Sequence, residues 1–171
     1  MPGAKEWKMF KVGELVVYPA HGVGVIETIE TKEISGGHQA FYIMRILEND
    51  MIIMIPKGNA QTVGLRHIVS KEEIPRIYEV LKDHDFVSNN GQSWHRRYRE
   101  YVERLKTGSV CSLAEVLKEL ILIGEEKELS FGERKLLDTA RRLLIKELSI
   151  AQDVPEKTIE KELSSLLDTT F

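Results

Sequence analysis

The spacing of apolar residues along the chain changes near residue 70. Before that point, apolar residues occur in short runs rich in valine and isoleucine, separated by turns that contain glycine, asparagine and aspartate. Such runs predict β-strands joined by tight turns. The expected strands cover residues 14–19, 22–34, 40–47, 51–56 and 63–69. Five short strands of this kind predict a small antiparallel barrel or a strongly bent sheet.

Two glycines interrupt the second expected strand, at Gly22 and Gly24. Glycine inside a strand marks either a bulge or a place where another part of the backbone comes close. We therefore expect one of these features at this point of the sheet.

After residue 70 the apolar residues follow a helical period. The residues Leu113, Val116, Leu117, Leu120 and Ile121 recur at i, i+3, i+4, i+7 and i+8, which predicts an amphipathic helix. Similar patterns predict five helices in all, at 71–83 and 93–106 and around 113–121, 137–148 and 159–167. The predicted fold class is α+β with two domains: a small antiparallel β domain at 1–70 and a compact all-α helical domain at 71–171.

Three serines are each followed three residues later by a glutamate, which is the capping-box pattern of a helix start. The pairs are Ser70 with Glu73, Ser112 with Glu115, and Ser130 with Glu133. The expected helix at 93–106 departs from this pattern, because Ser93 is followed by Arg96 and Arg97. A cation in the first turn of a helix costs about 0.3–1 kcal/mol at low salt. The basic first turn therefore needs an explanation.

The overall composition is that of an ordinary soluble globular protein, with 42% hydrophobic and 30% charged residues among 171. The net charge of −3 excludes binding to nucleic acid through overall basicity, so such binding would need a local patch. The single cysteine, Cys111, excludes a disulfide framework and is typical of a reducing cytosol. We expect neither a signal peptide nor a membrane span, and a cytoplasmic location.

The chain contains none of the common catalytic or nucleotide-binding motifs, such as a Walker A loop, H-E-x-x-H, C-x-x-C or G-x-S-x-G. The group Asp83, His84 and Asp85 has the residue types of a metal site, but a polar surface loop explains it equally. His21, within PAHG, is interpreted as a turn residue, and Cys111 as a small, half-buried hydrophobic residue. We therefore expect no enzyme, no metal, no cofactor and no small-molecule substrate.

The segment 93–106 allows two interpretations. On a helix its apolar residues form one stripe, with arginine and lysine on both flanks and Glu100 four residues before Arg104; this describes a solvated, salt-bridged helix with a core-facing stripe. Alternatively, an aromatic residue at the helix start beside arginines suits nucleic acid, because guanidinium groups neutralise phosphates and a flat ring stacks on or wedges between bases. The stripe consists of Trp94, Tyr98, Tyr101, Val102 and Leu105.

Several longer segments match one family in order and spacing. They are 10-FKVGELVVYPAHGVGVIETIE-30, 51-MIIMIPKGNAQTVGLR-66, 94-WHRRYREYVERLKTG-108, 113-LAEVLKEL-120 and 130-SFGERKLLDTARRLLIKEL-148. The chain resembles the CarD/CdnL family of bacterial transcription factors over roughly residues 9 to 167. The first segment is shared with the polymerase-binding module of the transcription-repair coupling factor. The tryptophan-led basic helix makes the match specific, and the chain has no helicase motifs.

The resemblance implies that the N-terminal domain is a Tudor-like barrel that docks on the β1 lobe of the RNA polymerase β subunit. Docking would add a polymerase strand to the barrel at 51–56, through Ile52, Met54 and Pro56, with Lys32 as a further contact. Some relatives carry arginine at the positions of Lys32 and Met54, so we expect a more apolar contact here. The sequence leaves open whether Ile52 and Met54 face outward or toward the core.

The resemblance also implies that the helical domain contacts promoter DNA at the upstream edge of the transcription bubble. Trp94 would act as a minor-groove wedge, and Arg96, Arg97 and Arg99 would contact flanking phosphates. Arg141 and Arg142 form a further basic pair. The implied function is stabilisation of the promoter open complex by a cytoplasmic protein that associates with the nucleoid through polymerase. The alternative is a Tudor- or KOW-like module that binds RNA or ribosomal components, with a helical partner domain.

Overall fold

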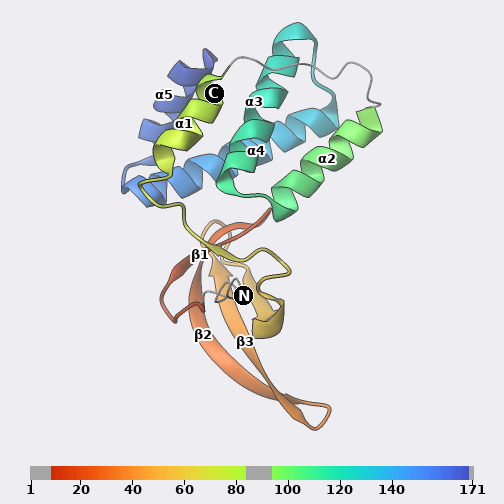
Figure 1. The fold of residues 1–171 in the computed structure, drawn as a ribbon, viewed down its shortest axis with the longest axis vertical. Coiled ribbons are helices and arrows are strands. Elements are labelled where there is room, and N and C mark those ends of the chain that lie inside the picture. Colours follow the sequence, from red (N-terminus) through yellow and green to blue (C-terminus); the bar gives the residue numbers. More distant parts are fainter. Residues whose placement is uncertain (1–8, 84–93, 170–171) are drawn as a thin grey trace, which may run out of the picture. The chain divides into compact units, whose positions relative to one another are not determined.

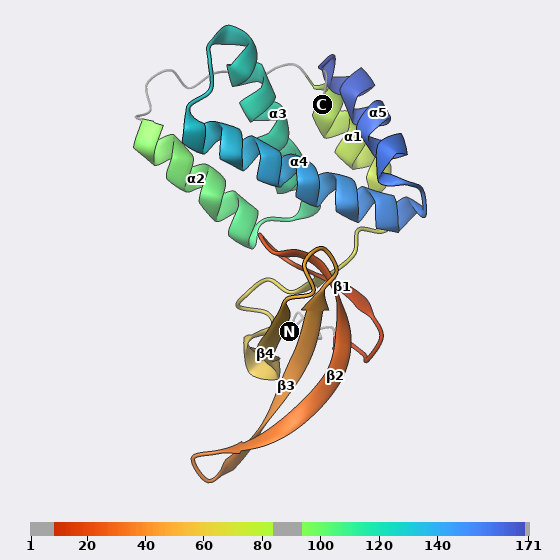
Figure 2. The same cartoon turned by 180° about the vertical axis from the view of Figure 1, so that it is seen from behind.

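The structure, a computed structural model, describes residues 9–83 and 94–169. The chain forms two compact units that divide between Ile68 and Val69, two residues before the boundary expected from the sequence. Figures 1 and 2 show a curved β-sheet in the first unit and packed helices in the second.

The first unit is an antiparallel sheet of five strands in the order β4-β3-β2-β1-β5. The sheet is open. Strands β4 and β5 stand at the two ends of this order, and they do not pair with each other among the described residues. The strongly bent antiparallel sheet is confirmed among the described residues, and the barrel closure is not. The strands are β1 Leu15–Tyr18, β2 Gly22–Ile34, β3 Gly37–Ile46, β4 Ile52–Pro56 and β5 Arg66–His67, with a 3₁₀ turn at Lys57–Asn59.

The long β2–β3 hairpin owes its curvature to a bulge between Ile26 and Thr28. The expected close approach occurs at Gly24, where an added Cβ would lie 2.5 Å from Met44 Cε and 2.7 Å from the Arg45 carbonyl oxygen. The bulge therefore lies beyond the two glycines, and the close approach lies at the second of them.

The core of the first unit lies beneath the bent sheet. Tyr42 is almost fully buried, and its hydroxyl accepts a hydrogen bond from the backbone N–H of Phe10. The turn at His21 closes through the His21 N–H and the Tyr18 carbonyl oxygen, 2.9 Å apart, which confirms its interpretation as a turn residue. The buried residues of this core are Phe10, Val16, Ile26, Tyr42, Met44, Ile46, Ile55, Ala60 and Leu65.

The second unit contains five helices among its described residues. Helix α3 packs against α1, α2 and α4, and the long helix α4 also packs against α2 and α5 (Figure 1). The apolar stripes expected from the sequence meet in this core, where Leu117, Leu144 and Ile159 are fully buried. The helices are α1 Ile74–Lys82, α2 Trp94–Thr107, α3 Val110–Glu126, α4 Phe131–Gln152 and α5 Glu156–Leu167.

The three expected capping boxes have different outcomes. Ser130 and Glu133 form a complete box at the start of α4. The box at Ser112 is wrong, because the N-cap of α3 is Ser109, whose hydroxyl accepts from the Ser112 N–H. At Ser70 only the half in which Glu73 accepts from the serine N–H appears, and α1 begins one residue after Glu73.

Candidate protein and nucleic-acid interfaces

Strand β4 lies at one end of the sheet order, paired with β3 along one side. Its side chains alternate between the two faces. Ile55 is buried and Ile53 packs against the core, whereas Ile52 and Met54 are 55% and 44% exposed. The question left open by the sequence is thereby answered: Ile52 and Met54 point outward. Pro56 is half-buried and ends the strand.

Lys32, on β2, lies close to the outward face of β4. Its Nζ is 4.0 Å from the sulfur of Met54, a weak hydrogen-bond geometry. Two residues 22 positions apart in sequence therefore share one surface. We call the exposed side chains of Lys32, Ile52 and Met54 the β4 surface.

Helix α2 begins at Trp94, whose side chain lies outside the described part of the structure. Arg96 and Arg99 are exposed. Arg96 Nε lies 3.8 Å from a carboxylate oxygen of Glu100, an exposed i, i+4 pair of the kind that contributes little to stability. The side chains of Arg96 and Arg99 thus lie on the solvent side of the helix.

Arg97 lies differently. Its Nη2 is 3.3 Å from Oε2 of Glu133 on α4, and the two side chains are only 19% and 4% exposed. The structure therefore directs this arginine into the helical unit, although the family resemblance implied a phosphate contact for it.

Arg104, two turns further along α2, also points inward. Its guanidinium group donates to Glu115 at 2.8 Å and to Glu119 at 3.0 Å, both on α3. The favourable pair with Glu100 expected from the spacing is replaced by these contacts. Burial lowers the pKa of Arg104, but the two carboxylates outweigh it and raise that pKa above its ordinary value.

Between these two arginines lies Tyr101, which is almost fully buried. Burial raises the pKa of its phenol well above the ordinary value, and the charge of Glu119 raises it further, against the opposing effect of Arg97 and Arg104. The apolar stripe of α2 therefore faces the core at Tyr101 and Leu105, while part of its charge enters a polar network with α3 and α4.

Phe131 is a candidate that the sequence reasoning missed. It is the first residue of α4 and is 85% exposed. It lies two residues before Glu133, the partner of Arg97 on α2, and the starts of α4 and α2 lie side by side (Figure 2). The signal was available, because Phe131 precedes Leu136 by five residues and so lies off the buried stripe of its helix.

The remaining candidates offer little chemistry. Among residues 9–83 and 94–169, no three histidine, cysteine or acidic side chains gather as metal ligands would. Of the group Asp83, His84 and Asp85, the last two lie outside the described residues. Cys111 is half-buried within α3, as expected. None of the described helices is long and apolar enough to cross a membrane.

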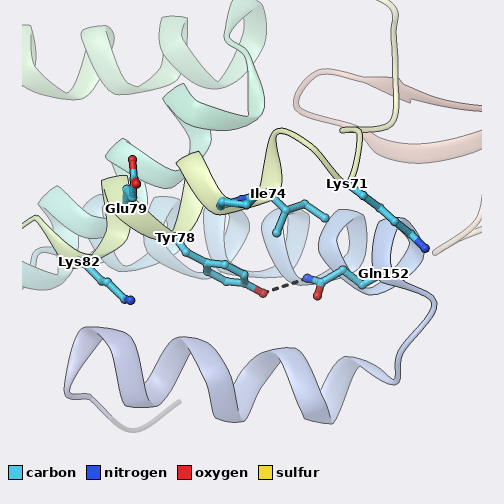
Figure 3. A pocket seen from close by; sticks show the side chains of 7 residues that line it. Lys71, Ile74, Tyr78, Glu79, Lys82 and Gln152 are labelled. Carbon is cyan, nitrogen blue, oxygen red and sulfur yellow. Dashed lines mark hydrogen bonds between the residues drawn. The ribbon is translucent and has the colours of Figure 1, made fainter.

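A groove lies beside α1, near the end of α4 (Figure 3). The Tyr78 hydroxyl points toward Gln152, whose amide donates to it at 2.9 Å, and it donates in turn to Glu162 at 2.8 Å. Burial and Glu162 raise the pKa of Tyr78, while the Gln152 contact lowers it. These groups satisfy one another, which describes a packing contact between helices. The labelled lining residues are Lys71, Ile74, Tyr78, Glu79, Lys82 and Gln152.

Two family models match successive parts of the chain. The CarD-like/TRCF RID domain matches residues 10–69, and the CarD C-terminal domain matches residues 76–164. The chain belongs to the CarD/CdnL family of transcription factors. Such a family is not a class of enzymes. The alternative of an RNA- or ribosome-binding module finds no support in these matches.

Relatives of this CarD-family chain cover it to different extents. A Bacillus subtilis (strain 168) protein named "Putative transcription factor YdeB" is 33% identical over 152 residues, which is 89% of this chain and 98% of the relative. A solved structure of CdnLNt from Myxococcus xanthus is 46% identical, with a TM-score of 0.33, and covers 40% of this chain and 97% of its own. The N-terminal domain of Myxococcus xanthus CarD is 34% identical, with a TM-score of 0.31, and covers 39% and 89%. At these TM-scores the fold rests on the strand pairing described above.

Proposed function

We propose that this CarD-family protein is a transcription regulator that docks on the β1 lobe of the RNA polymerase β subunit through β4. In the same complex it stabilises the promoter open complex through the start of α2. The match of residues 10–69 to a domain shared with the transcription-repair coupling factor supports polymerase as the partner. The observation that carries the proposal is the outward-facing apolar side of an edge strand.

Edge strands of soluble proteins are usually protected, because an exposed apolar edge invites pairing with another chain. On β4 the outward residues Ile52 and Met54 are apolar and exposed, and the strand ends only at Pro56. A partner strand added to this edge would gain main-chain hydrogen bonds, while Ile52 and Met54 would supply side-chain contacts. Lys32, beside Met54, would add one positive charge at the border of the contact.

The start of α2 supplies the DNA contact in this proposal. Trp94 would insert at the upstream edge of the bubble, where the bases are already unstacked, and Phe131 would lie beside it as a second apolar contact. The exposed guanidinium groups of Arg96 and Arg99 would contact the flanking phosphates, which positions the helix without reading the sequence.

The mechanism is linkage and not catalysis. Docking on polymerase holds the helical unit near the promoter, so a weak DNA contact acts at a high effective concentration. Because the aromatic contact fits opened DNA better than closed duplex, it shifts the equilibrium toward the open complex by that difference in affinity. A net charge of −3 agrees with a protein that depends on this tether and binds free DNA weakly.

The test is the affinity of the full chain for a purified β1-lobe fragment of bacterial RNA polymerase. Ile52→Glu and Met54→Glu should each weaken binding at least about tenfold, about 1.4 kcal/mol, because they place a carboxylate in an apolar contact. The matched control is Val12→Glu, since Val12 is 59% exposed and lies outside β4. Equal binding by all three variants would reject the β4 surface. Tight binding of RNA together with no binding of the lobe would favour the alternative module.

A further inference from the structure

The two carboxylate oxygens of Glu133 contact different helices. Its Oε1 accepts from the Ser130 N–H at 3.2 Å, which completes the cap of α4, and its Oε2 accepts from Arg97 at 3.3 Å. The first turn of α2 and the first turn of α4 are thereby joined through one side chain, and both views show the two helix starts side by side (Figures 1 and 2).

The burial of this pair decides what Arg97 can do. With 4% of the Glu133 side chain exposed, moving Arg97 outward to a phosphate would strip a nearly buried carboxylate of this ion pair. Separating a nearly buried ion pair is unfavourable, because this contact then no longer offsets the cost of removing the carboxylate from water. Arg96 differs from Arg97 in that its ion pair with Glu100 is exposed on both sides.

The second inward arginine shows the same arrangement at the other end of the helix. Arg104 lies seven residues, or about two turns, after Arg97 and contacts Glu115 and Glu119 of α3. Helix α2 is thus held to α4 near its start and to α3 near its end, by arginines on one flank. The opposite flank carries the exposed Arg99.

We propose that Arg97 is a positioning residue, which holds the first turn of α2 against α4 so that Trp94, Arg96 and Arg99 can reach DNA, and that it contacts no phosphate itself. The inference rests on the proposed function for its consequence at the promoter. Its structural part, the clamp between Arg97 and Glu133, applies to the free protein as well.

The first measurement is open-complex lifetime against salt concentration, with purified bacterial RNA polymerase and the full chain. A residue that contacts a phosphate contributes about 0.9 to the slope of log affinity against log salt. Arg96→Gln should therefore lower the slope of the stabilisation by about that amount. Arg97→Gln should reduce the stabilisation roughly threefold or more, and any change of slope should be shared by Glu133→Gln, since both variants release the same turn.

The matched variant is Glu133→Gln. Glutamine keeps the capping box but removes the charge that Arg97 pairs with, so it should reproduce the effect of Arg97→Gln. The double variant should be no worse than either single variant, because both act on one contact. Arg97→Lys keeps the positive charge and should recover part of the lost stabilisation.

Hydrogen exchange of the free full-length protein separates this inference from the proposed function. Arg97→Gln and Glu133→Gln should speed exchange of the backbone N–H groups of residues 98–101, which donate to the carbonyls of the first turn of α2, while Arg96→Gln should leave it unchanged. If the wild-type protein does not lengthen open-complex lifetime, the proposed function fails. The exchange experiment still tests whether Arg97 and Glu133 hold α2 against α4. A lower salt slope for Arg97→Gln, together with normal behaviour and exchange of Glu133→Gln, would overturn the inference and make Arg97 a phosphate contact.

Discussion

Strand β4 turns apolar side chains toward solvent, whereas the start of α2 turns part of its charge away from it. Ile52 and Met54 are exposed on the sheet edge, although apolar side chains ordinarily contribute to stability by burial. Arg97, which belongs to the most basic stretch of the chain, lies against a nearly buried glutamate. In both regions the burial of side chains is therefore the reverse of what their residue types predict: apolar side chains are exposed on β4, and an arginine is largely buried on α2.

The two departures have different meanings. An exposed apolar edge is the kind of surface that a protein partner covers, as we propose for β4. An inward arginine is explained within the fold, because Glu133 needs a counter-charge where it is buried. Composition alone would have counted Arg96, Arg97 and Arg99 as one basic patch. In the structure, Arg96 and Arg99 face solvent, whereas Arg97 pairs with Glu133 on α4.

The largest expected effect comes from breaking the sheet that presents β4. Gly24→Val should destabilise the first unit by about 3 kcal/mol, because its Cβ would meet Met44 and the Arg45 carbonyl oxygen at 2.5 and 2.7 Å. Hydrogen exchange of the β2 and β3 peptides in the full chain measures this. Exchange as slow as in wild type would contradict the close approach.

An intermediate effect should appear in the helical unit at alkaline pH. The folded unit holds the Tyr101 proton more tightly than the unfolded chain, since the phenol pKa is raised by burial and by Glu119. The stability this contributes is present below pH about 10, the ordinary tyrosine value, and is lost as the pH rises above it. The free energy of unfolding should fall by at most about 1.4 kcal/mol per pH unit through this one group.

Tyr101→Phe should flatten that decline. Urea unfolding followed by helical circular dichroism, at pH 8 and above pH 10, compares the variant with wild type. Since Tyr78 also has a raised pKa, Tyr78→Phe is the control for a second tyrosine. An identical decline in wild type and in Tyr101→Phe would show that the phenol does not titrate as described.

The smallest effect on stability is expected at Phe131. Because its side chain is 85% exposed, Phe131→Ala should change the free energy of unfolding by no more than about 0.5 kcal/mol. It should nevertheless reduce the stabilisation of open complexes if Phe131 lies beside Trp94 on DNA. Unfolding in urea and open-complex lifetime, measured on the same preparation, distinguish the effect on stability from the effect on open complexes. A large loss of stability would show that Phe131 is a packing residue.

Local sequence patterns predicted the two-part fold and most of its elements. The strand and helix periods located five strands and five helices of the described chain, because each period reflects which face an element buries. The patterns failed where two nearby serines could each cap the same helix. Ser112 has the right spacing to Glu115 for a capping box, but Ser109 occupies the cap and Ser112 lies at the third helical position.

The candidate site was less predictable, for two physical reasons. Every residue from 51 to 55 is apolar, so alternation could not tell the inner face of β4 from its outer face until pairing with β3 defined it. The partner of Arg97 lies 36 residues away. Periodicity placed Arg97 on the flank of the apolar stripe, but a contact with another helix carries no local signal.

The most direct test of the account is the lifetime of a promoter open complex with purified bacterial RNA polymerase, comparing wild type, Trp94→Ala and Met54→Glu. Wild type should lengthen the lifetime. Trp94→Ala should lose most of this effect while still binding polymerase, and Met54→Glu should lose it because it no longer binds. An unchanged lifetime with bound wild-type protein, or full activity of Trp94→Ala, would contradict the proposed role of α2 in holding the DNA open.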